Sequence, residues 1–135
     1  MAKEKIVASS GTRKRAVARA TLKPGTGIVR INSKALDTYK PRIAQLKIKE
    51  ALILAEGLSN TVNISIKVHG GGVMGQAEAA RMAIARGLIS FSKDKKLKET
   101  YENYDRQLIV ADVRQKETRK PNYSKARKAR QKSYR

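Results

Sequence analysis

Positive charge constrains this chain more than any other feature of its sequence. Its 135 residues include 31 Lys and Arg but only 11 Asp and Glu, so the net charge at pH 7 is +20. Such a chain associates with polyanions, because each phosphate that it neutralises releases condensed counterions. Nucleic acid is therefore the first partner that the composition predicts. A membrane surface is a weaker candidate, because no segment pairs a basic helical face with a bulky apolar one.

Size and residue types exclude several classes of protein. A chain of 15.0 kDa holds a single small core. It has no cysteine and one histidine, His69, which excludes disulfides and thiolate metal sites and leaves little scope for metal or triad catalysis. It also lacks the roughly 18 apolar residues of a membrane span and the apolar run of a secretory signal. We therefore expect a cytoplasmic protein that is not an enzyme and that uses no cofactor, metal or small-molecule substrate.

Charge divides the chain into two regions. Residues 113–135 contain ten basic residues and one acidic residue, so this short segment carries +9 of the net charge of +20. Its only large apolar side chains after Val113 are Tyr123 and Tyr134, which bury too little surface to offset the entropy of ordering the chain. The sequence thus predicts a globular body over residues 1–112 and an extended basic tail over residues 113–135, which becomes ordered only against phosphates.

Alternating apolar and polar residues predict the strands of the body. The alternation from residue 12 to 22 predicts one strand with an alanine-rich face and a cationic face, the latter carrying Arg13, Arg15 and Arg19. Residues 23–27 contain one Pro and two Gly, which are typical of a turn, so residues 28–31 are expected to return as the second strand of a hairpin. Residues 62–68 alternate most regularly and predict a further strand.

Helical spacing accounts for most of the remaining body. A core helix is expected between Pro41 and Gly57. A second helix follows residue 72, with one face of mostly small residues that allows close packing on a sheet. Asp94 is expected to cap a short helix with an apolar edge formed by Leu97, Tyr101 and Tyr104, and residues 108–110 are the last able to enter the core. Together these elements predict an α+β two-layer sandwich, with a mixed sheet of about four strands and helices on one face.

The segment Gly70-Gly71-Gly72-Val73-Met74-Gly75 formally matches a dinucleotide-binding motif. That motif needs a later strand with an acidic residue about 20 positions on, but Asp94 stands there in a lysine-rich helical context. A phosphate-binding NTPase loop is excluded as well, because Gln76 and Ala77 replace its Lys and Ser/Thr. Two interpretations remain: the glycines permit a tight strand-to-helix turn, and their backbone N–H groups also accept an RNA phosphate.

Several charged residues can be interpreted either as solvated surface positions or as functional residues. The face that carries Arg13, Arg15 and Arg19 is too charged to bury against protein and needs water or phosphate, and the overall charge favours phosphate. Arg81 and Arg86 are either solvated or in contact with a phosphate, and the sequence does not decide between these. The spacing of Glu99, Glu102 and Asp105 indicates a solvated acidic face rather than acid chemistry or a metal site, and His69 is interpreted as a surface or turn residue.

Three blocks of sequence carry a resemblance to a known family: residues 11–19, residues 70–88 and residues 123–135. Because of the order and spacing of these blocks, the chain resembles the small-subunit ribosomal protein nine family over nearly its whole length. The bacterial pattern of that family ends in Ser-Lys-Arg, whereas this chain ends in Ser133-Tyr134-Arg135. The ending resembles that of the archaeal and eukaryotic cytosolic branch.

The resemblance implies a fold similar to the second domain of ribosomal protein five and a place in the head of the small ribosomal subunit. It implies small-subunit rRNA, the peptidyl-site tRNA and neighbouring head proteins as partners, with the basic tail threading through rRNA toward the tRNA. Its expected role is structural, during translation. The alternative is a non-ribosomal basic protein that compacts or regulates nucleic acid, acting on DNA.

Two sets of site residues follow from the charge pattern and the resemblance together. The expected rRNA-binding residues are Arg13, Lys14, Arg15, Arg19, Gly70, Gly71, Gly72, Arg81, Arg86, Arg114, Lys116, Arg119, Lys120, Lys125, Arg127, Lys128 and Arg130. The residues expected to approach the peptidyl-site tRNA are Lys132, Ser133, Tyr134 and Arg135.

Overall fold

A five-stranded mixed sheet forms one layer of the structure, a computed structural model that describes residues 4–129 and residue 133. The order of the strands is β1-β2-β5-β3-β4, with β5 antiparallel to β2 and parallel to β3. Because β5 lies between β2 and β3 in the sheet, it joins the N-terminal hairpin to the rest of the body. The strands are β1 (Val7–Arg13), β2 (Ala16–Pro24), β3 (Val29–Ile31), β4 (Lys34–Ala35) and β5 (Val62–His69).

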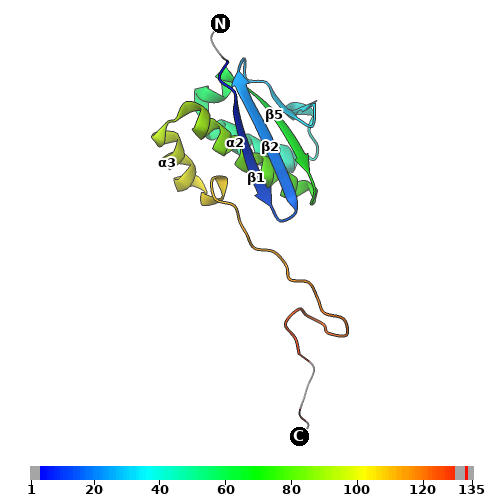
Figure 1. Ribbon diagram of the computed structural model, residues 1–135. Coiled ribbons are helices and arrows are strands. Elements are labelled where there is room, and N and C mark those ends of the chain that lie inside the picture. The colour runs from blue at the N-terminus through cyan, green and yellow to red at the C-terminus, as the bar shows by residue number, and fades with distance from the viewer. Residues whose placement is uncertain (1–3, 130–132, 134–135) are drawn as a thin grey trace.

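Helices cover one face of this sheet and form the second layer (Figure 1). The long helix α2 (Val73–Ser92) packs against β1 and β2, and α1 (Arg42–Leu54) lies beside α2. The short helix α3 (Lys95–Tyr104) packs at the edge of these two helices. The α+β two-layer architecture with helices on one face is thus confirmed. Three short 3-10 turns complete the body, over Leu36–Thr38, Glu56–Thr61 and Arg106–Leu108.

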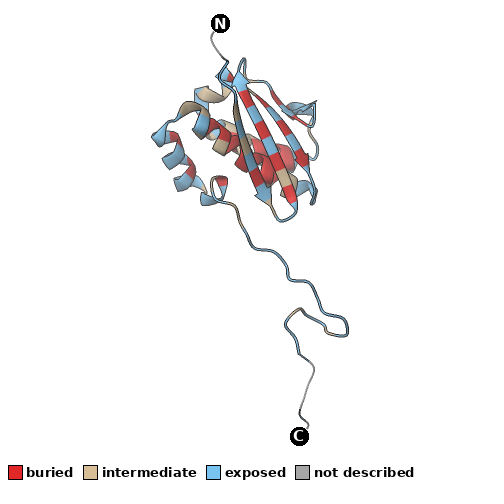
Figure 2. Cartoon of the chain, viewed as in Figure 1, coloured by how far each residue is buried: buried red, intermediate tan, exposed pale blue. Residues whose placement is uncertain are grey.

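The core lies between α2 and the inner side of the sheet. In β5, Val62, Ile64 and Ile66 point inward and are almost fully buried, which confirms the alternation seen in the sequence (Figure 2). Small residues of α2 are buried on nearly every side, because the helix is enclosed by the sheet and by α1. The buried face of α2 includes Ala77, Ala80, Ile84 and Leu88, as expected.

The predicted single strand over residues 12–22 is wrong, because a two-residue turn at Lys14 and Arg15 divides it. Residues up to Arg13 belong to β1, which pairs with β2 in an antiparallel hairpin with Arg13 opposite Ala16. Lys14 adopts a left-handed φ of 52°. Hairpin turns of this kind favour Gly, Asn or Asp, so a Lys-Arg turn gives no sequence signal. The sheet thus has five strands rather than about four, and the sequence revealed neither the separate β1 nor the very short β4.

The predicted hairpin between residues 12–22 and 28–31 is also wrong. The segment after β2 does turn, but it crosses the end of β5, so that β3 pairs with the far side of β5 rather than with β2. Asn63 of β5 holds this crossing, because its side-chain Oδ1 accepts hydrogen bonds from the N–H groups of Thr26 and Ile28 at 2.9 and 3.0 Å. The strand β5, from later in the chain, therefore pairs with β2 at the position where the local sequence predicted β3.

The C-terminal end of the body matches most of the sequence expectations. Asp94 caps α3 by accepting a hydrogen bond from the Lys96 N–H at 2.9 Å. Tyr101 is fully buried and donates its hydroxyl to the Ala51 carbonyl at 2.7 Å, which ties α3 to α1. Tyr104, in contrast, is 57% exposed and does not join the apolar edge of Leu97 and Tyr101. Leu108 is the last fully buried residue before the chain leaves the body.

The two layers approach each other closely at Gly11 of β1. A Cβ atom at this position would lie 2.2 Å from the Ala79 carbonyl oxygen and 2.8 Å from the Ala83 nitrogen, both backbone atoms of α2. The Ser9 hydroxyl donates a hydrogen bond to the Ala83 carbonyl at 2.7 Å beside this contact. Helix α2 therefore packs on β1 at a distance that only glycine allows.

We expect Gly11→Ala to lower the free energy of unfolding by about 1–3 kcal/mol, because the new methyl group must push α2 away from β1. The measurement is urea unfolding followed by circular dichroism. Gly57→Ala is the matched control, since a Cβ atom at Gly57 would meet nothing within 4 Å. Equal effects of the two substitutions would contradict the close approach.

Candidate nucleic-acid interface

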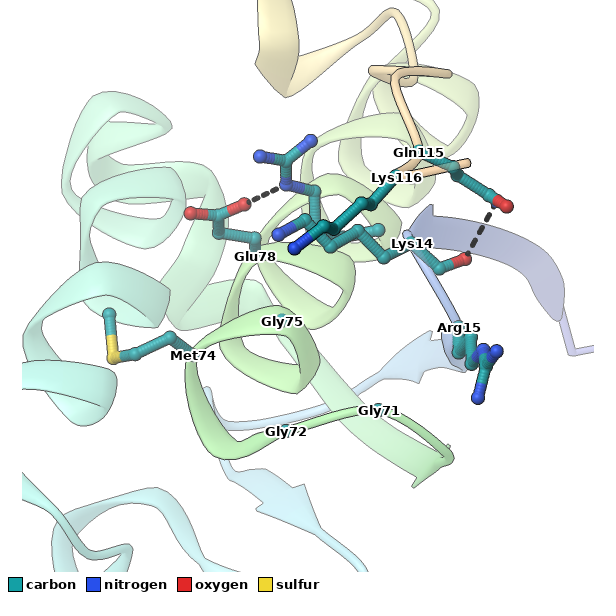
Figure 3. A pocket seen from close by; sticks show the side chains of 10 residues that line it. Lys14, Arg15, Gly71, Gly72, Met74, Gly75, Glu78, Gln115 and Lys116 are labelled. Atoms are coloured by element: carbon teal, nitrogen blue, oxygen red, sulfur yellow. Dashed lines mark hydrogen bonds and ion pairs between the residues drawn. The ribbon is translucent and has the colours of Figure 1, made fainter. Parts of the chain in front are cut away.

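An open pocket of about 520 Å³ lies where three segments of the chain meet (Figure 3). The β1–β2 turn contributes Lys14 and Arg15, and the chain that leaves the body contributes Gln115 and Lys116. The Gln115 side chain donates to the Lys14 carbonyl at 3.5 Å, which joins two of these segments. The third segment is the start of α2 with the turn before it, represented by Gly71, Gly72, Met74, Gly75 and Glu78.

Glycines allow the turn between β5 and α2 to lie against the hairpin. Gly70 and Gly71 have positive φ values of 75° and 63°, which L-residues with side chains rarely adopt. A Cβ atom on Gly70 would lie 2.5 Å from the Arg15 carbonyl oxygen, and one on Gly71 would lie 2.9 Å from the Ala16 nitrogen. The interpretation of these glycines as a tight strand-to-helix turn is confirmed. Gly72 caps α2, where backbone N–H groups and the helix dipole favour an anion.

Arg13 does not lie on the cationic face where the sequence placed it. It lies on the inner side of β1, where its Nε is 2.7 Å from Glu78 of α2 and its Nη1 is 2.9 Å from Asp112. Gln107 also donates to Asp112, at 3.3 Å. We call Arg13, Glu78 and Asp112 the tail clasp, because they bind the point where the chain leaves the body to both layers of the fold.

The carboxylate of Asp112 is the centre of the tail clasp. Its side chain is only 7% exposed and accepts hydrogen bonds from the backbone N–H and the guanidinium of Arg114, at 3.0 and 2.7 Å. These bonds, with added attraction from Arg13, hold the pKa of the Asp112 carboxyl well below its usual range. A carboxyl with a lowered folded-state pKa stabilises the fold above its ordinary pKa and ceases to do so only as the pH falls through the lowered value. The Asp112 carboxylate is therefore charged throughout the neutral range.

Arg81 and Arg86 both bind groups inside the protein. Arg81 is 4% exposed and forms ion pairs with Glu50 of α1, at 3.0 Å, and with Asp105. Although burial raises the pKa of Asp105, hydrogen bonds from the Gln107 N–H and from Arg81 outweigh it and lower the pKa. Arg86 donates to the carbonyls of Ile109 and Ser10, at 2.8 and 3.0 Å. These partners come from distant parts of the chain, so sequence spacing did not reveal them.

The other acidic residues singled out in the sequence divide between solvent and the protein interior. Glu99 and Glu102 are exposed as expected, but Asp105 is paired with Arg81 and so leaves the predicted solvated face. His69 is exposed at the end of β5, in agreement with the sequence interpretation. Over residues 4–129 and 133, no three His, Cys, Asp or Glu residues come together as metal ligands. In the same part of the chain, no helix has the length and apolar character needed to cross a membrane.

The tail leaves the body after the last 3-10 turn and extends away from it without regular secondary structure in its described residues (Figure 1). Among these, Arg127 pairs with Glu117 through hydrogen bonds of 2.9 and 3.1 Å. Ser133 is exposed, whereas Arg130, Lys132, Tyr134 and Arg135 lie outside the described residues. The exposed cations of the tail are Arg114, Lys116, Arg119, Lys120, Lys125, Arg127 and Lys128.

The outer face of the sheet holds cations that sequence reasoning missed. Arg19 is exposed there as predicted, and the strand register adds Lys67 directly opposite it on β5. Lys23 and Arg30 are also exposed on β2 and β3. Lys67 could have been found from the alternation of residues 62–68, which places it among the outward polar positions. The neighbours of Arg19 could not, because they depend on the pairing of strands.

The fold and these charges define a small basic α+β protein with an extended cationic arm. Comparison with known families is more specific: residues 11–135 match the model of the family described as ribosomal protein S9/S16, and the chain belongs to that family. The resemblance inferred from the three sequence blocks is thereby confirmed.

Curated relatives agree over almost the full length of the chain. It is 48% identical to the small ribosomal subunit protein uS9 of Methanothrix thermoacetophila, in an alignment that covers 97% of this chain and 99% of the relative. It is 48% identical to the protein of the same name from Pyrobaculum aerophilum, over 97% and 92%, and 47% identical to that of Desulfurococcus amylolyticus, over 98% and 95%. All three organisms are archaea, which agrees with the archaeal and eukaryotic cytosolic branch that the Ser-Tyr-Arg ending resembles.

We expect Asp112→Asn to loosen the start of the tail, because the neutral amide no longer holds Arg13 and Arg114 by charge. Backbone order parameters of residues 113–116, measured by NMR relaxation, should fall into the flexible range below about 0.6. Glu117→Gln is the matched control, since it removes an exposed ion pair with Arg127 outside the body. Unchanged order parameters in Asp112→Asn would show that the tail clasp does not hold the tail.

Proposed function

We propose that this protein is a structural constituent of the small ribosomal subunit in the cytoplasm, where its body binds rRNA and its tail extends toward the peptidyl-site tRNA. Its role is one of position rather than catalysis. The names of its full-length relatives support the ribosomal part of this proposal. The rRNA-binding part of the proposal is supported by one observation. Lys14, Arg15 and Lys116 come from segments far apart in the sequence and lie together beside the glycine turn.

The chemistry of this pocket suits a phosphate group. Lys14, Arg15 and Lys116 are exposed and pair with no carboxylate in the described part of the chain, so they remain available to an anion. The start of α2 at Gly72 adds backbone N–H groups and a positive dipole end, and Gly72 leaves open space where a side chain would stand. Lysines supply point charges, and the planar guanidinium of Arg15 supplies paired donors. An RNA backbone held here would pass beside the start of the tail.

The tail suits a route that a folded domain cannot take. From residue 111 onward the described residues have no helix or strand and are almost all exposed. Such a segment becomes ordered when phosphates neutralise its charges, so it can thread between RNA helices. We propose that Lys132, Ser133, Tyr134 and Arg135 reach the peptidyl-site tRNA. Tyr134 offers a ring that stacks on a base or sugar, and Arg135 offers a guanidinium for a phosphate.

Binding to RNA across a salt series tests the body. We expect selective binding to a transcript of the rRNA of the small-subunit head, over scrambled RNA and duplex DNA of equal length, that persists above about 200 mM salt. The double variant Lys14→Gln/Lys116→Gln should reduce the slope of log affinity against log salt by about 2, because two phosphate contacts are lost.

The control for this experiment is Lys95→Gln/Lys96→Gln, which removes the same charge from the exposed start of α3. Equal effects of the two double variants would exclude the pocket as the phosphate site. Equal affinity of the unmodified protein for all three nucleic acids would instead favour the compaction of DNA.

Shortened chains test the tail. Removal of Arg135 should weaken binding of peptidyl-site tRNA to assembled small subunits and leave assembly intact, because only the distal contact is lost. A chain that ends at Asp112 should lose tRNA binding as well but keep a cooperative thermal transition, since Leu108 holds the last fully buried side chain among the described residues. Defective assembly without Arg135, or loss of the transition in the shorter chain, would contradict the division of roles.

A further inference from the structure

Acidic residues are absent from all five strands of the sheet, although eleven occur in the chain. They lie instead in helices, turns and loops, where several of them neutralise arginines. Glu78 and Asp112 pair with Arg13, and Glu50 and Asp105 pair with Arg81. Among the described residues, carboxylates thus form ion pairs with the arginines on the helical side. None pairs with a cation on the outer face of the sheet, where Glu4 lines a pocket beside Lys23 and Arg30.

The cations on that outer face are brought together by strand pairing. Arg19 of β2 lies directly opposite Lys67 of β5, and the next outward row along the strands is Thr21, Ser65 and Arg30. Lys23 follows in the third row. All four cations are exposed and, over residues 4–129 and 133, have no ion pair with a carboxylate. We call Arg19, Lys23, Arg30 and Lys67 the sheet-face cations.

This arrangement is unfavourable for folding alone. Like charges directly opposite each other in an antiparallel pair repel and destabilise the sheet. Side chains on adjacent strands are about 5 Å apart, and those two positions along a strand are about 7 Å apart, so the repulsion includes the whole cluster. A polyanion placed on the face converts this repulsion into attraction. The partner of this face is therefore expected to carry closely spaced negative charges.

The side chains of the face select the form of the nucleic acid. None of the five strands contains Phe, Tyr or Trp, so the face offers no aromatic ring for unstacked bases, which is how sheets recognise single-stranded RNA. It offers instead the exposed hydroxyls of Ser10, Thr12, Thr21 and Ser65, on the same face as the cations. Cations and hydroxyls contact phosphates and sugar 2′-OH groups, which a double helix presents without unstacking its bases.

We propose that the outer face of the sheet binds the sugar–phosphate backbone of double-helical RNA. This inference rests on the proposed function, and it adds a second RNA surface to the pocket beside the tail. Helices α1 and α2 lie behind the sheet, so the face is open to a partner of this size (Figure 1). The pocket and the sheet face together would hold the body on RNA from two sides of the β1–β2 hairpin.

The double variant Arg19→Gln/Lys67→Gln tests this proposal through two changes of opposite sign. Its affinity for an RNA hairpin should fall about tenfold or more, and its salt slope by about 2, because two phosphate contacts are lost. Its urea midpoint should equal or exceed that of the unmodified protein, because the repulsion between Arg19 and Lys67 is removed. A loss of RNA affinity with retained stability cannot come from misfolding.

The specificity for double-helical RNA is tested with an unstructured RNA of the same length. We expect the loss of affinity for the hairpin to exceed that for the unstructured RNA, and Lys95→Gln/Lys96→Gln to leave both nearly unchanged. Equal losses for the two RNAs would overturn the preference for a double helix. A variant that matches the control on the hairpin but fails to enter the small subunit would show that an acidic protein, rather than RNA, covers the face.

The outcome of this test is separable from that of the proposed function. If the unmodified protein prefers the head rRNA while Arg19→Gln/Lys67→Gln binds as tightly as the control, the sheet-face proposal is wrong and the proposed function stands. If the unmodified protein shows no preference for the head rRNA, the proposed function fails first.

Discussion

The close packing of α2 on β1 and β2 is the contact on which the rest of the structure depends. It requires Gly11, where a Cβ atom would stand 2.2 Å from a carbonyl oxygen of the helix, and the small buried residues of α2. Because α2 occupies one side of the sheet so fully, that side becomes the core and the other side remains open. The same contact brings Glu78 of α2 within reach of Arg13, so it also determines where the tail begins.

Electrostatics then divides the cations of the body into two groups. Arginines on the helical side are partly or fully buried, and a buried charge is tolerated only when it is paired. Arg81 and Arg13 accordingly have two carboxylate partners each. Cations on the sheet face and at the hairpin turn are exposed and lack such partners in the described part of the chain, so they are available to an external polyanion. Four of the eleven acidic residues, Glu50, Glu78, Asp105 and Asp112, pair with Arg13 and Arg81.

The pocket and the tail clasp both lie at the point where the tail leaves the body. The pocket beside the glycine turn lies next to Gln115 and Lys116, and the tail clasp fixes the chain a few residues earlier at Asp112. A body held on RNA near this point would give the tail a defined starting position. Most of the tail then needs no structure of its own, because its partner supplies the order. The chain that carries this folded body and extended basic tail belongs to a family of ribosomal proteins.

The sequence by itself determined the net charge, the start of the basic tail near Asp112, the two core helices, the central strand over residues 62–68 and the family. These features follow from composition, periodicity and contiguous motifs, which are local properties. Only the tertiary structure decided the face on which each arginine lies. The Lys14–Arg15 turn carries no glycine signal, yet it places Arg13 inside and Arg19 outside, because side chains alternate from Ala16 onward. Strand order and ion pairs such as that of Arg81 with Glu50 likewise join residues distant in sequence, and a local pattern cannot encode such pairing.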